Sequence, residues 1–204
     1  WNILALAWNY QPARSGVGYS GINIYAAQSP NGREYIQNSL KDTLVSGTSY
    51  CVKFFVNPIN LRYGVNQFGA YLDNGSVNTP VFAGAIILSP QISNPTTNYL
   101  IDTLNWMQIS GTLISNGTET YITLGNFSSN AQTDTSVIYS SPIKQAYYYI
   151  DDVSVIATDL PCIAGNDTSV CKYDSIYIGR PPEIGLDNIW TEITTSTQVG
   201  VGAG

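Results

Sequence analysis

The sequence of 204 residues contains no histidine. This absence excludes a Ser-His-Asp triad, a Cys-His nucleophile pair and an imidazole zinc site. Glycoside hydrolysis by paired carboxylates needs no histidine and stays formally open. Only 14 residues are acidic, however, and most of them stand in turn sequences. We therefore expect a protein that is not an enzyme.

Charge is scarce as well, since only 11% of the residues are charged and the net charge is −6. Proteins that bind nucleic acids need a basic face, so DNA and RNA are excluded as partners. No apolar run reaches the roughly 18 residues that a membrane span needs, so we expect no membrane insertion. Hydroxyl and amide side chains take the place of charged ones, which is typical of a secreted, extracellular protein.

Cysteine occurs three times, an odd number. Cys51 lies in the strand-like run YCVKFFV, and we expect it to be a buried apolar thiol. Cys162 and Cys171 flank the turn-rich IAGNDTSV. In an exported protein they can close this short loop as a disulfide.

The sequence does contain many short strand-like runs, and no segment keeps an apolar period near 3.6 residues. The runs cover residues 21–26, 33–40, 49–56, 66–72, 105–114, 119–127 and 147–158. Turn sequences such as SPNG, DNGS and SNGT separate them. This pattern predicts an all-β protein with an antiparallel sandwich or barrel.

The pattern of strand-like runs is interrupted after Thr158. The segment DLPC resembles a linker, because Pro161 resists continuation of a strand ladder. Short strand-like runs such as DSIYIG and NIWTEI follow. We expect one domain at residues 1–158, and a linker with part of a second β-sandwich at residues 159–204. The second segment is much shorter than the roughly 100 residues of such a domain.

The run YYYIDDVSV places two adjacent carboxylates in a predicted strand. Neighbouring side chains of a strand point to opposite faces. If Val153 and Val155 mark the buried face, Asp151 points inward and Asp152 outward. A buried carboxylate must be paired, hydrogen-bonded or bound to a metal ion, so Asp151 is the most informative charge of the chain.

The order of several motifs resembles a known group of bacterial surface proteins. The run YYYIDDVSV is similar to the last strand of jelly-roll carbohydrate-binding modules and their galactose-binding-like relatives. The other motifs lie at residues 14–25, 33–40, 44–56, 106–113 and 119–127. Together they resemble the N-terminal jelly-roll domain of large adhesin-like proteins exported by type IX secretion. Residues 164–179, followed by Trp190, resemble the start of a PKD-like or immunoglobulin-like repeat.

The resemblance implies an antiparallel jelly-roll β-sandwich followed by an incomplete immunoglobulin-like β-sandwich. It also implies a non-catalytic module for glycan binding or cell-surface adhesion, as part of a larger secreted protein. Sugars lay their CH faces on aromatic rings, so aromatic residues are the candidates for ligand binding. They are Tyr63, Tyr71, Trp106, Tyr139, Tyr147 and Tyr148. Each of them can instead be a core or edge residue.

A structural calcium ion, Ca²⁺, is the cofactor that the resemblance implies, with Asp151 as a ligand. Calcium takes roughly six to eight oxygen ligands, and Glu34 and Glu119 are weak candidates for the others. Two alternatives stay open. Asp151 can accept hydrogen bonds from backbone N–H groups or a tyrosine hydroxyl, or it can pair with Arg33.

Three triplets consist of Asp, followed by Ser or Thr, followed by an apolar residue. They resemble the acceptor sequence for O-linked glycans in such bacteria. The acceptor positions are Thr43, Thr103 and Ser175. Chance occurrence is the alternative, because the chain is rich in Asp, Ser and Thr.

A second function is a structural subunit of an extracellular filament or surface layer. The partial β-domain at residues 164–204 is expected to leave open strand edges, and the opening WNILALAW is apolar. Open edges invite pairing with another chain. A terminal segment that completes a neighbour's sheet would give a head-to-tail contact between copies of this chain.

Overall fold

The computed structural model describes residues 11–29, 31–77, 84–158, 188–191 and 198–202. The chain divides into two compact units, Trp1–Asp159 and Leu160–Gly204. The strands described in the first unit are β1 (Ser20–Ala26), β2 (Ile36–Ser39), β3 (Ser49–Pro58), β4 (Tyr63–Val65), β5 (Gly69–Asp73), β6 (Ile92–Ser93), β7 (Met107–Ile114), β8 (Tyr121–Gly125), β9 (Thr135–Val137) and β10 (Gln145–Ala157). A single turn of 3-10 helix, η1 (Asn130–Gln132), precedes β9.

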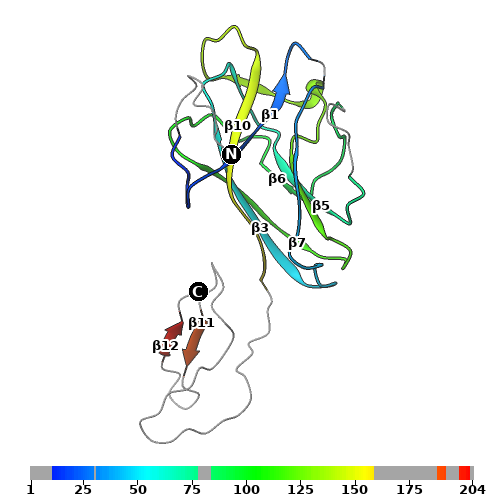
Figure 1. Cartoon of the computed structure of the whole chain (residues 1–204), viewed down its shortest axis with the longest axis vertical. Coiled ribbons are helices and arrows are strands. Elements are labelled where there is room, and N and C mark those ends of the chain that lie inside the picture. The colour runs from blue at the N-terminus through cyan, green and yellow to red at the C-terminus, as the bar shows by residue number, and fades with distance from the viewer. Residues whose placement is uncertain (1–10, 30, 78–83, 159–187, 192–197, 203–204) are drawn as a thin grey trace, which may run out of the picture. The chain divides into compact units, whose positions relative to one another are not determined.

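Two four-stranded sheets form the sandwich of the first unit. The first sheet has the order β1-β10-β3-β7, and the second sheet has the order β2-β8-β5-β6. Every pair of neighbouring strands is antiparallel. Strands far apart in the sequence lie side by side, since β1 lies beside β10 (Figure 1) and β2 pairs with β8. This nesting of strands is the jelly-roll arrangement, and it confirms the expected antiparallel jelly-roll β-sandwich.

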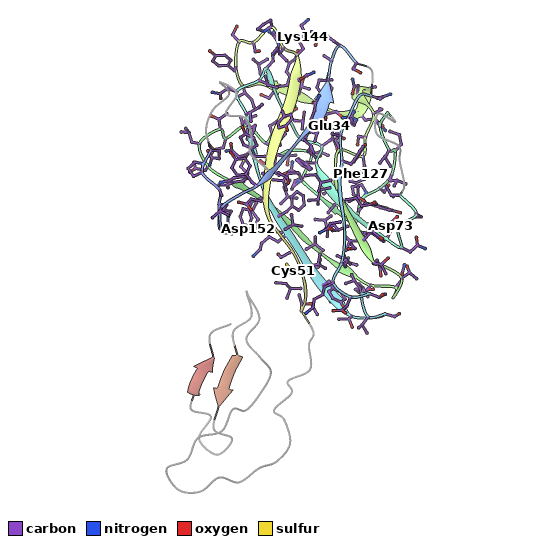
Figure 2. The ribbon with its side chains drawn as sticks, in the orientation of Figure 1. Glu34, Cys51, Asp73, Phe127, Lys144 and Asp152 are labelled. Atoms are coloured by element: carbon purple, nitrogen blue, oxygen red, sulfur yellow. The ribbon has the colours of Figure 1, made fainter. Side chains whose placement is uncertain are left out.

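The core lies between the two sheets because the strands alternate between apolar and polar residues. In β3, Val52, Phe54 and Val56 are completely buried, whereas Cys51 and Lys53 on the opposite face are partly exposed. The rings of Phe54 and Tyr148 both pack on Phe68, with 5.7 Å between centroids in each pair. Side chains fill the interior of the unit (Figure 2). Cys51 is therefore a partly exposed free thiol, and the expectation of a buried thiol is wrong.

A β-bulge in β10 changes the face of its side chains. Asp151 pairs with Phe55 and Ser154 pairs with Lys53, so residues 152 and 153 together stand opposite Phe54. Asp152 has φ 51°, in the left-handed region, which Asp tolerates better than most residues. Tyr148 and Ile150 are buried before the bulge, and Ala157 is buried after it.

Because of this bulge, the valines do not mark the buried face of β10, and the expectation that Asp151 points inward is wrong. Val153 is 44% exposed, so it does not mark a buried face. Asp151 lies on the outer face of the first sheet with Tyr147 and Tyr149, since these residues alternate with buried Tyr148 and Ile150. Regular alternation does not continue through a bulge, and the sequence contains no glycine here to indicate one.

Two smaller sheets complete the description. The short strands β4 and β9 pair with each other in the first unit. In the second unit, β11 (Asn188–Thr191) and β12 (Gln198–Gly202) form an antiparallel pair. The remainder of the predicted immunoglobulin-like segment, with Cys162, Cys171 and Ser175, lies outside the described residues. Among the described residues, no helix is long and apolar enough to cross a membrane.

Candidate ligand-binding site on the outer face of the first sheet

Four aromatic side chains form a continuous row on the outer face of the first sheet. Tyr19 lies 5.7 Å from Trp106 and 4.6 Å from Tyr149, and Tyr149 lies 6.3 Å from Tyr147, measured between ring centroids. All four rings are half-buried. We call these four residues the aromatic row. Large aromatic rings that stay partly accessible on a sheet face can offer apolar contact area to a ligand.

The sequence places two members of the row through alternation in β10. Tyr147 and Tyr149 point outward because Tyr148 between them is buried. Gly21 in β1 pairs with Tyr149. A Cβ atom at Gly21 would lie 2.6 Å from Cε1 of Tyr147. The Tyr147 ring therefore lies over β1 at the one place where β1 has no side chain.

The loop before β7 positions Trp106. Asp102 accepts hydrogen bonds from the backbone N–H groups of Leu104 and Asn105 at 2.9 and 3.0 Å. Buried Asn57 in β3 donates to the carbonyls of Asp102 and Asn105 at 3.2 and 2.9 Å. These bonds anchor the loop to the first sheet and fix the position of Trp106, which follows the loop.

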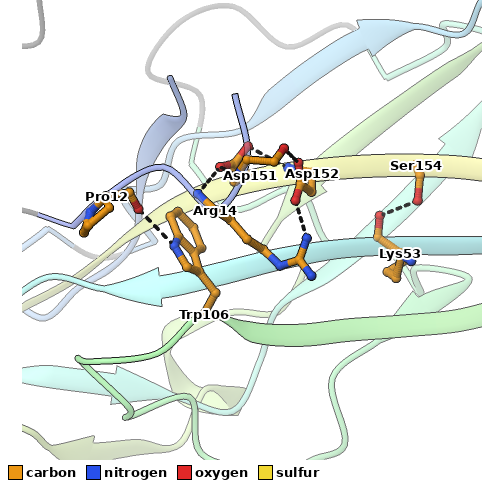
Figure 3. Close-up of polar contacts among 8 residues, drawn as sticks. Pro12, Arg14, Lys53, Trp106, Asp151, Asp152 and Ser154 are labelled. Carbon is orange, nitrogen blue, oxygen red and sulfur yellow. Dashed lines mark hydrogen bonds and ion pairs between the residues drawn. The ribbon is translucent and has the colours of Figure 1, made fainter. Parts of the chain in front are cut away.

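The segment before β1 is attached to the bulge of β10 (Figure 3). The backbone N–H groups of Arg14 and Ser15 donate to Asp151 Oδ2 at 2.7 and 3.4 Å. The Arg14 guanidinium forms an ion pair with Asp152, and the Ser15 hydroxyl donates to the same carboxylate. We call these four residues the N-terminal clasp.

Two further contacts hold the segment before β1 against the first sheet. The Arg14 guanidinium stacks on Phe55, with 3.5 Å from Cζ to the ring centroid, a favourable cation–π geometry. The Trp106 indole N–H donates to the carbonyl of Pro12 at 3.1 Å (Figure 3). The clasp thus fixes the course of the chain that brings Tyr19 to Tyr149.

The protonation equilibria of the row reflect its partly buried position. Burial raises the pKa of Tyr149, and the neighbouring Tyr19 and Tyr147 raise it further. Burial also raises the pKa of Tyr147, with a second contribution from the negative charge of Glu34. Both hydroxyls are therefore neutral at physiological pH and can donate or accept hydrogen bonds at the rim of the row.

The structure brings together only two of the six aromatic candidates, Trp106 and Tyr147. Tyr148 is completely buried, and its hydroxyl accepts from Val65 N–H at 3.0 Å and donates to the Leu100 carbonyl at 2.7 Å. Its assignment to ligand binding is therefore wrong. Tyr148 lies on the inner face of β10 with Ala146 and Ile150, which are also buried.

The other three candidates lie away from the row. Tyr63 packs edge-on against Tyr25 at 5.8 Å, and Tyr71 packs against Phe127 at 6.0 Å on the second sheet. Tyr139 is 56% exposed in the segment after β9. The sequence reading missed Tyr19 and Tyr149. Alternation with Tyr147 could have indicated Tyr149, but no local signal indicates Tyr19.

The three carboxylates proposed for calcium do not gather in one group. Within the described part of the chain, no three His, Cys, Asp or Glu side chains come close enough to hold a metal ion. Asp151 accepts hydrogen bonds from backbone N–H groups, which is the first of the two alternatives. The second alternative was a pair with Arg33, but the Arg33 guanidinium donates to the Ile24 carbonyl and to Asn130 instead. Glu34 accepts Asn23 N–H at 2.8 Å. Calcium at Asp151 stays a prediction.

Glu119 has local partners of its own. It is buried and accepts from the Ser115 hydroxyl at 2.6 Å and from the backbone N–H groups of Asn116 and Thr118 at 3.2 Å. Burial raises the pKa of Glu119, but these hydrogen bonds outweigh it and hold the pKa below its usual value. Of the predicted glycan acceptors in the described residues, Thr43 is exposed and Thr103 is half-buried. Their modification stays a prediction.

The clasp should respond to acid. Hydrogen bonds from Ser15 and Arg14 lower the pKa of Asp152 below its ordinary value of 3.8. A lowered pKa in the folded state stabilises the protein above pH 3.8, and this contribution is lost as the pH falls through the folded value. We expect Asp152→Asn to lower the free energy of unfolding by at most about 1 kcal/mol at neutral pH. Urea unfolding at pH 7 and pH 3 should give a smaller difference at pH 3; an equal difference would contradict this role.

Substituting Gly21 with alanine should displace the Tyr147 ring with little change in the stability of the fold. The new Cβ would lie 2.6 Å from the Tyr147 ring, and the ring can rotate away because it is the end of a side chain. Alanine also restricts the unfolded chain more than glycine. We expect the free energy of unfolding to change by less than about 1 kcal/mol, while the Tyr147 ring signals shift in an aromatic NMR spectrum. An unchanged ring environment would show that Gly21 does not create the place for this ring.

Comparisons with known proteins identify no family. No family model matches the chain, and no curated protein matches it. Among solved structures, it is similar to the CBM22-1 and GH10 modules of endo-1,4-β-D-xylanase 10B from Clostridium thermocellum, complexed with xylohexaose. The identity is 17% and the TM-score 0.37, over 74% of this chain and 24% of that chain. The chain thus spans about a quarter of that protein's length.

Proposed function

We propose that the first unit is a non-catalytic, extracellular module that binds a glycan or another cell-surface ligand on the aromatic row. We propose further that it belongs to a larger, secreted, adhesin-like protein. The observation that carries this proposal is the continuity of the row, in which four half-buried rings follow one another across the outer face of the first sheet. Sugar rings present CH groups to such faces and hydroxyl groups to the polar rim.

Polar groups at the rim support the same proposal. Exposed Glu34 lies beside β1 near the Tyr147 end of the row, because Asn23, which donates to its carboxylate, pairs across the sheet with Tyr147. The hydroxyls of Tyr147 and Tyr149 add neutral donors and acceptors. Ligand sites combine apolar or aromatic area with a few polar groups that fix orientation. This mixture suits a carbohydrate better than a purely apolar partner.

The chemistry near the row supports a binding role without catalysis. Two carboxylates on the same face, Asp151 and Asp152, are engaged within the N-terminal clasp by hydrogen bonds and an ion pair. With no histidine in the chain, proton transfer near neutral pH has few other candidates.

Binding to insoluble polysaccharides and to a glycan array tests the proposed function. The full chain should bind at least one polysaccharide, and Trp106→Ala should abolish or strongly weaken that binding. Tyr71→Ala is the matched control, because it removes a half-buried ring from the second sheet. Absence of binding to any glycan, or equal losses in both variants, would contradict the proposal. Release of soluble sugars would contradict its non-catalytic part.

The disulfide between Cys162 and Cys171 and the assembly into a filament both stay predictions. The cysteines and the segment WNILALAW lie outside the described residues.

A further inference from the structure

We propose that Tyr147 and Tyr149 of the aromatic row, together with the adjacent Glu34, recognise an alkylammonium group of the ligand, such as the free amine of an amino sugar. This inference rests on the proposed function, because it names the class of ligand for the same site. It concerns the end of the row that lies over β1.

The ring geometry is the first observation. Tyr147 and Tyr149 are nearly perpendicular, with an interplanar angle of 81° and 6.3 Å between their centroids. Tyr149 and Tyr19 are inclined by 54°. Rings inclined in this way form a corner instead of one flat platform. A cation in such a corner can contact the negative face of one ring and lie within reach of the next, which is how aromatic side chains bind ammonium groups.

The charge beside this corner is the second observation. Glu34 is attached to β1 at Asn23, whose N–H donates to Glu34 Oε2 at 2.8 Å, and Asn23 pairs across the sheet with Tyr147. Glu34 is exposed. Among the described residues, the one ion pair is that between Arg14 and Asp152, so no described cation neutralises Glu34. Its field reaches Tyr147, since it contributes to the raised pKa of that hydroxyl.

The guanidinium of Arg14 is already engaged, because it pairs with Asp152 and stacks on Phe55. Lys53 of β3 lies on the same outer face, and its charge acts on Asp152. A ligand on the row therefore meets an exposed negative charge at the Tyr147 end with which no described cation forms an ion pair. This arrangement favours a cationic ligand group and disfavours uronic acids and sulfated sugars.

The experiment compares hexasaccharides by isothermal titration calorimetry with the full chain at low salt. The probes are a hexamer of glucosamine, its N-acetylated counterpart, cellohexaose and a hexamer of galacturonic acid. Choline is the probe for a quaternary ammonium group that is not part of a sugar. We expect the glucosamine hexamer to bind roughly five- to tenfold more tightly than the two neutral hexamers. Galacturonic acid should bind least.

Glu34→Gln decides between this inference and a general affinity for sugars. The substitution keeps an oxygen that can accept from Asn23 N–H, so the fold should be retained, and the melting temperature checks this. We expect it to remove the preference for glucosamine, so that the amino hexamer and the neutral hexamers bind the variant with the same affinity. Asp42→Asn, a change at an exposed acid elsewhere in the sequence, should leave the preference intact.

The outcomes separate the two proposals. Equal binding of neutral and amino hexamers by the native chain, or a preference that survives in Glu34→Gln, would overturn the ammonium inference while the glycan-binding function stands. If no sugar binds but choline binds in a manner that depends on Glu34, the inference stands and the glycan-binding function fails. Binding of glucosamine without binding of choline would assign the site to amino sugars.

Discussion

Replacing Tyr149 with alanine is expected to weaken glycan binding at least about tenfold, equivalent to about 1.4 kcal/mol. Tyr149 is one of the two inner rings of the row, because it contacts both Tyr19 and Tyr147. Its loss removes its own contact area and leaves both neighbours without the ring that holds their orientation. Aromatic pairs of this kind contribute about 0.5–1.5 kcal/mol beyond the area they bury.

Tyr139→Ala is the matched control for that measurement. Tyr139 is 56% exposed and lies outside the row, so its removal should change the affinity less than about twofold. Titration calorimetry on both variants, with circular dichroism to confirm folding, gives the comparison. Similar losses of affinity in the two variants would show that tyrosines bind sugars here without a defined site.

The largest effect on stability is expected for substitution of Tyr148, the residue before Tyr149 in β10. Its ring is completely buried and its hydroxyl bonds to Val65 N–H and the Leu100 carbonyl. Truncation of a buried aromatic residue costs about 3–5 kcal/mol, a large part of the roughly 5–15 kcal/mol that stabilises a typical domain. Tyr148→Ala should therefore lower the free energy of unfolding by about 4 kcal/mol.

Tyr147→Ala provides the contrast, because Tyr147 is half-buried on the outer face. It should cost roughly 1 kcal/mol and affect ligand binding instead. Chemical denaturation of both variants measures the difference. A larger loss for Tyr147 than for Tyr148 would mean that the faces of β10 before the bulge are reversed.

The sequence predicted the fold class well because turn residues separated short alternating runs. The runs at 49–56 and 105–114 correspond to β3 and β7 within a few residues. The short strands β4, β6 and β9 were missed, since two or three residues carry too little alternation to be recognised. The strand order of the jelly roll came from the resemblance, because local patterns contain no information about which strands pair.

The candidate site was predicted less completely, for two physical reasons. The bulge at Asp152 shifts the alternation of β10, so the valines could not indicate the face of Asp151. The row also depends on contacts between residues far apart in the chain, such as Tyr19 with Trp106 and Arg14 with Asp152. Such contacts follow from the strand order and not from any local pattern.

An NMR titration of the isotopically labelled full chain with the best-binding oligosaccharide maps the ligand site onto individual side chains. The largest shifts are expected at the Trp106 indole and at the rings of Tyr19, Tyr147 and Tyr149, while two other tyrosine rings stay unchanged. These are Tyr71 on the second sheet and Tyr35, which precedes β2 and packs against Phe127. The largest shifts at Tyr35 and Tyr71, with an unperturbed Trp106 indole, would contradict ligand binding on the aromatic row.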